Sequence, residues 1–288
     1  MNYVDKDFHY LNQEDISKLL KPRPKVSHKG TFGHMALIAG SRGMAGAAVL
    51  AAKAAIRTGL GLLTVYGPEC NRVILQISIP EAMYKDNSLY TNILFAEDLI
   101  KYSALAIGPG LGTDELATNM LAEVLDPLSQ AIVLDADALN ILSGNKKLLD
   151  KLPRNAILTP HPKEFQRLIG EVPNDTLDAI DKARIFTNKY QVIIVLKGAN
   201  TQIIFPDGRV YINSTGNTGL ATGGSGDVLT GMIGSLLAQG YKAENAALVG
   251  VYLHGLAADL ALETESEESM QASDIINYLG RAFKRLKI

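Results

Sequence analysis

The chain has 288 residues, 47% of them hydrophobic and 20% charged, the proportions of a globular protein that buries a substantial core. Its 28 basic and 30 acidic residues nearly cancel. This balance argues against nucleic acid or a membrane surface as the main partner, because both favour clustered positive charge. The single cysteine, Cys70, excludes an intramolecular disulfide and fits a reducing compartment.

The first residues are polar and acidic, without the basic start and apolar run of a secretory signal. No apolar stretch reaches the roughly 18–20 residues needed to cross a bilayer. We therefore expect a cytoplasmic protein.

Strands and helices are expected to alternate along the chain. In chain order the sequence predicts a strand at 35–39, a helix at 46–58, strands at 62–66 and 104–107, a helix at 114–125 that Thr113 could cap, strands at 131–134 and 156–158, a helix at 176–190 and a strand at 192–196. The pattern then changes, because 201–205 and 210–212 flank Pro206-Asp207-Gly208 and predict a β-hairpin. Helices are expected at 227–239, 244–262 and 273–287.

This order of elements predicts an α/β fold with a mostly parallel central sheet, helices on both faces and a small β-hairpin. The chain has no internal repeat or long linker, so residues 1–288 are expected to form one domain, with 1–27 as its N-terminal extension and helix. Ligands in such folds bind at the carboxyl ends of the strands. The residues that follow each strand are therefore the candidate site.

The strongest signal is the glycine-rich run TGNTGLATGGSGD, which opens an apolar helix. Glycines at 223, 224 and 226 remove side chains where the loop becomes a helix. Backbone N–H groups there can converge on an anion, and the helix dipole adds to the attraction. We expect the amides of Gly224, Ser225 and Gly226 to form an anion hole.

Asp227 follows directly, in the first helical turn. A carboxylate beside a phosphate site is repelled by it, so the expected role of Asp227 is to orient or deprotonate an attacking hydroxyl. The alternative is that Asp227 caps the helix and the glycines only pack a tight turn.

The glycine-rich helix start resembles that of the ribokinase-like superfamily of small-molecule kinases. Within it, the chain most resembles the ADP-dependent NAD(P)H-hydrate dehydratases. The resemblance runs from about His28 to the C-terminus. It rests on six pieces in order, each at a predicted strand end: HKGTFGHMALIAGSRGMAGAA at 28–48, AIGPGLG at 106–112, LDADAL at 134–139, LTPHPKEF at 158–165, VLKGANT at 195–201 and NSTGNTGLATGGSGDVLTG at 213–231.

The resemblance implies repair of hydrated nicotinamide cofactors. Such enzymes phosphorylate the added hydroxyl of (S)-NAD(P)H hydrate, and elimination of phosphate restores the ring double bond; single-domain bacterial members convert ADP to AMP and phosphate. It implies Mg²⁺ as cofactor, ADP as co-substrate, NADH hydrate and NADPH hydrate as substrates, and a homotetramer. It also implies cooperation with an NAD(P)H-hydrate epimerase, a domain sometimes fused to the N-terminus of relatives, which this chain is too short to carry.

The resemblance also implies site residues. It places ADP or AMP along Lys197, Gly198, Ala199, Asn200 and Thr201, and at Gly226. It places the hydrated dinucleotide at Ala47, Gly110, His161 and Asp227, with Asp227 catalytic. It gives Glu164 a metal role through water, although the related kinases have Asn where His161 stands here.

The residues themselves leave alternatives open. Lys197 is expected to pair with a phosphate as a point charge, or to be a solvated lysine in a hairpin connection. His161 and Glu164 suit a substrate loop, or a surface loop before a helix whose positive end favours Glu164. Asp135 and Asp137 either bind through water or metal or cap the following helix. Ala47 and Gly110 suit substrate contact or helix packing.

Two other site types are not expected. No second His or Cys lies at zinc-ligand spacing from His161, which argues against a zinc site. The sequence contains no G-x-x-x-x-G-K-[ST], which excludes a P-loop. Two rival functions remain: a kinase of a small alcohol, such as a vitamin precursor or sugar, and a nucleotide-sensing protein without chemistry. Asp227 counts against the latter, since pure binding gains nothing from a carboxylate near phosphate.

Overall fold

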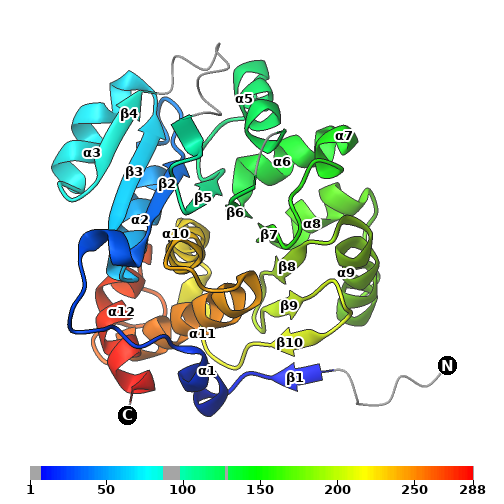
Figure 1. The fold of residues 1–288 in the computed structure, drawn as a ribbon. Helices are drawn as coiled ribbons and strands as arrows, with labels where there is room; N and C mark the ends of the chain where they lie inside the picture. Colours follow the sequence, from blue (N-terminus) through cyan, green and yellow to red (C-terminus); the bar gives the residue numbers. More distant parts are fainter. Residues whose placement is uncertain (1–7, 87–97, 127–128, 288) are drawn as a thin grey trace.

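The structure is a computed structural model that describes residues 8–86, 98–126 and 129–287. Within these described ranges, ten strands form one sheet in the order β1-β10-β9-β8-β7-β6-β5-β2-β3-β4 (Figure 1). The strands are β1 (Phe8–Tyr10), β2 (His34–Ile38), β3 (Leu62–Gly67), β4 (Met83–Asp86), β5 (Ala104–Ile107), β6 (Ala131–Leu134), β7 (Ile157–Leu158), β8 (Ile193–Leu196), β9 (Gln202–Ile204) and β10 (Val210–Ile212). Among them, only β9 runs antiparallel to its neighbours.

Helices cover both faces of the sheet (Figure 1). One face carries α1 (Gln13–Leu19), α2 (Ala45–Arg57), α3 (Arg72–Ser78), α10 (Ser225–Ala238), α11 (Ala243–Ala261) and α12 (Ala272–Leu286). The other carries α5 (Glu115–Leu125), α6 (Ala136–Gly144), α7 (Lys146–Leu149), α8 (Pro162–Ile169) and α9 (Thr176–Tyr190). The predicted α/β class, with a mostly parallel sheet between two helical layers, is confirmed.

The strands alternate their side chains between the two cores. In β2, Met35 and Leu37 enter the first core, whereas Ala36 and Ile38 enter the second. This two-residue period, with both faces apolar, is what a sheet buried on both sides requires.

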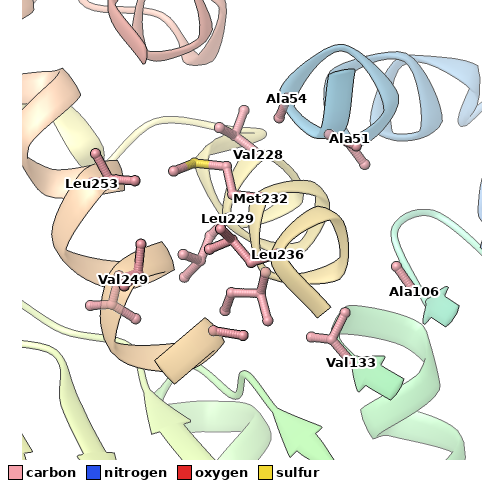
Figure 2. Packing of buried hydrophobic residues seen from close by; sticks show 14 of the residues in the cluster. Ala51, Ala54, Ala106, Val133, Val228, Leu229, Met232, Leu236, Val249 and Leu253 are labelled. Carbon is pink, nitrogen blue, oxygen red and sulfur yellow. The ribbon is translucent and has the colours of Figure 1, made fainter. Parts of the chain in front are cut away.

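Helix α10 is the centre of the first core (Figure 2). It packs against the alanine-rich α2 so closely that a Cβ on Gly231 would lie 2.0 Å from the Ala51 carbonyl oxygen. The small residues of α2 and this glycine allow the contact. It fixes the position of α10, whose N-terminus carries the glycine-rich run.

Most predicted elements are present with ends shifted by one or two residues, and the hairpin of β9 and β10 is confirmed. One cap prediction is wrong: Asp114, not Thr113, caps α5, because its Oδ1 accepts from the Ala117 N–H at 2.8 Å. The strands β1 and β4 and the helices α3 and α7 were not predicted, and α6 was considered only as a helix that Asp135 and Asp137 could cap. Among the described residues, no helix has the length and apolar character that a membrane span needs.

Candidate active site

The parallel strands bring the candidate residues to one edge. Strands β6, β7 and β8 run parallel and end beside one another, and the hydrogen-bond ladder continues past their ends. The Thr159 N–H donates to Leu134 at 3.1 Å, and the Lys197 N–H donates to Pro160 at 2.9 Å. Residues that follow different strands are therefore held in register across this edge.

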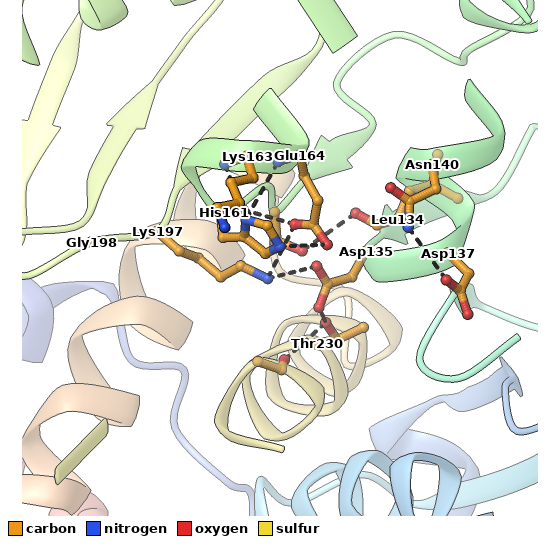
Figure 3. Close-up of polar contacts among 12 residues, drawn as sticks. Leu134, Asp135, Asp137, Asn140, His161, Lys163, Glu164, Lys197, Gly198 and Thr230 are labelled. Atoms are coloured by element: carbon orange, nitrogen blue, oxygen red, sulfur yellow. Dashed lines mark hydrogen bonds and ion pairs between the residues drawn. The ribbon is translucent and has the colours of Figure 1, made fainter. Parts of the chain in front are cut away.

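Lys197, Asp135 and Thr230 form a hydrogen-bonded chain at this edge (Figure 3). The Lys197 ammonium donates to Asp135 Oδ1 at 2.7 Å, and the Thr230 hydroxyl donates to Asp135 Oδ2 at 2.7 Å. Asp135 is almost fully buried, so both carboxylate oxygens need these partners. The ammonium has three N–H donors, which leaves capacity for a phosphate.

The glycine-rich run opens α10 beside that lysine. Gly224 has φ +91°, and a Cβ there would lie 2.4 Å from Leu50 Cδ1, so the turn requires glycine. The helix begins at Ser225, and its first N–H groups have no partner within the helix. A Cβ on Gly226 would lie 3.2 Å from Lys197 Nζ. Of the predicted anion-hole residues, Gly226 therefore borders Lys197, whereas the Ser225 N–H donates to the Thr222 carbonyl at 3.5 Å.

Asp227 lies half-buried in the first turn of α10. In the described part of the chain its carboxylate makes no hydrogen bond or ion pair. Burial, followed by the negative charge of Asp135, raises the pKa of Asp227 to about 6, against the opposing effect of Lys197. A carboxylate with its pKa near neutrality and no partner is suited to accept a proton.

His161 and Glu164 form a capping box at the start of α8. The His161 N–H donates to Glu164 Oε2 at 2.8 Å, and His161 Nδ1 accepts from the N–H groups of Lys163 and Glu164 at 3.1 and 3.3 Å. Glu164 also lies 3.9 Å from Lys197 Nζ, and burial raises its pKa. The alternative role of these two residues, to stabilise the start of a helix, is therefore present. The same arrangement also places the Glu164 carboxylate near Lys197.

The carboxylates at this edge bear on the expected metal. Among the described residues, no group of three or more His, Cys, Asp or Glu could hold a metal ion. Asp135 and Glu164 nonetheless face the same ammonium. One or two carboxylates beside substrate phosphates are what Mg²⁺ usually finds in phosphoryl-transfer sites. The donor set fits Mg²⁺ that arrives with a nucleotide.

The two predicted substrate positions Ala47 and Gly110 meet. Gly110 has φ +57°, and a Cβ on it would lie 3.1 Å from the Ala47 Cβ. The same turn is tied to Asp137, whose Oδ2 accepts from the Gly112 N–H at 2.8 Å. The charge of Asp137 contributes to the raised pKa of Asp227, so this turn borders the same site.

The loop after β8 borders a cavity of about 440 Å³. Its lining is largely apolar on the side of α8 and α9 and includes Pro162, Phe165, Pro173, Ala179, Leu196, Lys197, Gly198, Ala199 and Asn200. Thr201 does not line it; its hydroxyl instead donates to the Gly198 carbonyl at 3.2 Å and closes the loop. Another cavity, of about 240 Å³, lies at the far end of α10, and none of the predicted site residues lines it.

Sequence reasoning left Asp135 open and missed Thr230 and His254. Asp135 precedes α6 but makes no side-chain cap bond. The following Ala136 has φ +48°, a strained conformation that clusters at functional sites. Thr230 and His254 are polar residues with non-polar neighbours on both sides, within largely apolar helices. That isolation was their only signal in the sequence.

The sheet, its helical layers and the glycine-rich helix start beside a strand-end lysine define a ribokinase-like α/β protein. A solved ribokinase-like superfamily protein from Enterococcus faecalis has a TM-score of 0.86 to this chain, 31% identity and 99% coverage of both chains. The chain belongs to the NAD(P)H-hydrate dehydratase family, whose family model matches residues 35–281.

Individual relatives show which members of this family the chain is similar to. A Bacillus subtilis ADP-dependent (S)-NAD(P)H-hydrate dehydratase is 38% identical and aligns over 96% of this chain and 99% of its own length. A crystal structure of the ADP/ATP-dependent enzyme from that organism, co-crystallised with ATP/Mg²⁺, has a TM-score of 0.86 and 37% identity, and the match covers 96% of this chain and 98% of that one. A bifunctional NAD(P)H-hydrate repair enzyme of Moorella thermoacetica is 39% identical over 92% of this chain. The present chain spans only about half (52%) of the length of that enzyme.

Proposed function

We propose that the protein dehydrates (S)-NADH hydrate and (S)-NADPH hydrate to the reduced cofactors and converts ADP to AMP and phosphate. One observation carries the proposal. Asp227, whose carboxylate has no hydrogen-bond or ion-pair partner among the described residues and whose pKa is raised to about 6, lies in the first turn of a helix whose Gly226 borders the Lys197 ammonium. Phosphate-binding groups and a base for a hydroxyl are thus within one site.

The chain's own groups account for the expected steps. The amides of Gly224, Ser225 and Gly226 and the Lys197 ammonium hold the diphosphate, and Asp227 accepts the proton of the substrate hydroxyl. The hydroxyl oxygen bonds to the β-phosphorus of ADP, and AMP leaves. Phosphate then departs with its C–O bond electrons, a neighbouring ring C–H gives up its proton to solvent water, and the C–H bond electrons form the double bond.

The remaining positions take supporting roles in the proposal. His161, Ala47 and Gly110 hold the hydrated dinucleotide, and the loop from Lys197 to Thr201 holds the nucleoside end of ADP beside its apolar cavity. Glu164, together with Asp135, would hold Mg²⁺ through water, and the ion would neutralise part of the diphosphate charge. The relatives named for ADP or co-crystallised with ATP/Mg²⁺ support these assignments.

We also propose the biological setting. Relatives of about twice the length are described as bifunctional repair enzymes, which supports cooperation with an NAD(P)H-hydrate epimerase. The single cysteine and near-neutral charge support a cytoplasmic location. A homotetramer is the proposed assembly, and exposed apolar side chains on α3 provide a surface for it.

A product assay tests the proposed function. Hydrated NADH is incubated with the protein, Mg²⁺ and either ADP or ATP, and the dihydronicotinamide absorbance is followed. We expect the absorbance to return, faster with ADP than with ATP at matched concentrations. Equal or faster turnover with ATP would overturn the nucleotide choice. Accumulation of a phosphorylated product without the chromophore would instead identify a small-alcohol kinase, and no turnover with either nucleotide would favour a sensing protein.

A further inference from the structure

Side chains contact the carbonyl oxygens of the two peptide groups on either side of Gly226. The Ser225 carbonyl accepts a hydrogen bond from His254 Nε2 at 2.9 Å. The Gly226 carbonyl lies 3.1 Å from the Thr230 hydroxyl, whose single proton is shared between this oxygen and the closer Asp135 Oδ2. Each carbonyl belongs to the same planar unit as the next N–H group. His254 therefore restrains the peptide that ends in the Gly226 N–H.

His254 comes from α11, outside the strand-end loops. It is buried at 9% exposure, and burial lowers its pKa to about 4. The imidazole is thus neutral at physiological pH, with one N–H donor. Because a carbonyl can only accept, that proton lies on Nε2. A neutral imidazole keeps this bond without placing a second positive charge beside Lys197.

The geometry explains why such a restraint matters at Gly226. In a trans peptide the C=O and the N–H point in opposite directions, so fixing the Ser225 oxygen toward α11 aims the Gly226 N–H away from α11. Gly226 has no side chain to limit its own backbone. The position a Cβ would occupy faces Lys197 Nζ at 3.2 Å, and a bulkier residue would compete with the ligand there.

Helix α11 also holds the loop that leads to this turn. The Thr215 hydroxyl donates to the Tyr252 carbonyl at 2.9 Å. Asp259 Oδ2 accepts from the Gly216 N–H at 2.9 Å. The bond from His254 therefore continues a row of contacts from one rigid helix to the glycine-rich loop.

We propose that His254 is a positioning residue that aims the Gly226 N–H at the diphosphate of the nucleotide. The inference rests on the proposed function in one respect, that the anion is a nucleotide phosphate. The competing explanation is a histidine that only fills and satisfies the core. The two differ in what its replacement does to anion binding.

The test uses His254→Leu, which removes the donor, and His254→Gln, whose side-chain amide retains an N–H donor. Calorimetry measures the affinity for ADP, pyrophosphate and adenosine. We expect His254→Leu to bind ADP and pyrophosphate roughly tenfold more weakly, the scale of one lost hydrogen bond to a charged group. Adenosine affinity should stay unchanged, and His254→Gln should recover most of the loss.

A matched control is His34→Leu. His34 is also partly buried and hydrogen-bonded to a hydroxyl, Thr64 Oγ1, at 2.9 Å. It lies at the first residue of β2, at the amino ends of the parallel strands and so away from the carboxyl ends where the candidate site lies. We expect it to lower the melting temperature without changing pyrophosphate affinity. If His254→Leu does not fold, His254→Met replaces it, since methionine adapts to irregular core space.

Wild-type ADP and pyrophosphate affinity in the folded Leu or Met variant would overturn the proposal. So would an equal loss of adenosine and pyrophosphate affinity, or a Gln variant as weak as Leu. These measurements need no hydrated cofactor. Anion binding that depends on His254 in a protein without dehydratase turnover would therefore reject the proposed function and leave this inference standing.

Discussion

At the scale of single residues, the charge around Asp227 decides the chemistry. Burial contributes most to its raised pKa, the charges of Asp135, Asp137 and Glu164 raise it further, and Lys197 lowers it. An incoming phosphate would add further negative charge. The position is therefore unfavourable for a carboxylate unless the reaction uses it. The alternative role as a helix cap is not seen, because Gly224 is the N-cap residue of α10 and no side chain makes a cap hydrogen bond there.

Asp227→Asn is predicted to fold, bind ADP as well or better, and lose turnover by about 10²–10⁴-fold, the scale of a lost general base. Because the pKa of Asp227 is raised from 3.8 to about 6 in the folded state, its ionisation costs stability progressively as the pH rises between these values, and the full cost is present above about 6. The variant should therefore melt at a higher temperature at pH 8. Initial rates on the hydrate and melting curves with and without ADP are the measurements. Near-normal turnover in the folded variant would leave Asp227 no catalytic role.

The pH dependence of the reaction gives an independent prediction. A base must be ionised to act, so kcat/KM should fall as the pH decreases through about 6, the pKa of Asp227. The profile is recorded across roughly pH 5–8 with ADP saturating. The residual activity of Asp227→Asn should lack this decline. An identical decline in the variant would assign it to another group.

Lys197→Ala is predicted to weaken ADP binding by roughly 1–3 kcal/mol, the range for a lost charged hydrogen bond. It also leaves the buried Asp135 with Thr230 as its remaining side-chain partner, so the melting temperature should fall as well. Calorimetry and thermal melting check both effects. Lys284→Ala, an exposed lysine on α12, serves as the control and should change neither. Unchanged ADP affinity in Lys197→Ala would remove this loop from the site.

At the scale of elements, α10 joins the core to the anion site. Its residues from Val228 to Ala238 are buried, and its first turn, at Ser225, Gly226 and Asp227, is only partly buried. A rigid helix anchored along its whole length holds its first N–H groups in a fixed direction. The close contact at Gly231 is what lets α10 sit against α2.

Gly231→Ala is predicted to destabilise the protein by about 1–3 kcal/mol or more, since its Cβ would overlap backbone and force the helices apart. The overlap is with the Ala51 carbonyl, at 2.0 Å. Gly280→Ala in α12 is the matched control, because nothing lies within 4 Å of its Cβ position. There alanine should stabilise by roughly 0.5–1 kcal/mol through helix propensity. The free energy of unfolding of both variants is measured in urea. Equal stability of the two variants would contradict the argument that Gly231 is required for close packing of α10 on α2.

Elements with a clear period were predictable from sequence, and those without one were not. The strands β5 and β6 appear at their predicted positions because both faces are apolar. In α3 the apolar residues Val73, Ile74 and Ile77 face solvent, so no buried stripe reveals the helix. The three residues of β1 carry no pattern, and their strand exists only because β10 accepts them as a neighbour.

The site was predictable in its loops and not in its pairings. Glycine runs and strand-end residues indicate a candidate ligand site, because parallel strands end together. The bond between Lys197 and Asp135 joins residues 62 positions apart, and the contact of His254 with Ser225 joins two helices. Such pairings depend on helix rotation and packing, which a single sequence does not encode locally.

At the scale of the whole molecule, the exposed side chains of α3 bear on assembly. Ile77 is 77% exposed, and Val73 and Ile74 lie beside it. If this surface joins subunits of the proposed tetramer, Ile77→Asp should give a smaller species by light scattering, because a charge cannot be buried there unpaired. Ile185→Asp, on α9 and 70% exposed, is the control and should leave the mass unchanged. A tetramer that survives Ile77→Asp would place the interface elsewhere.

The order of strands in the sheet has a consequence for how the molecule regains activity after unfolding. The chain moves outward from β2 to β3 and β4 and then returns to place β5 on the other side of β2. Parallel pairings of this kind close long loops before they gain contacts, which slows folding. Asp135, Lys197 and Asp227 lie on three separate segments. In refolding after dilution from urea, helical circular dichroism should therefore return before the ability to bind ADP, and no fragment that lacks α10 should bind it.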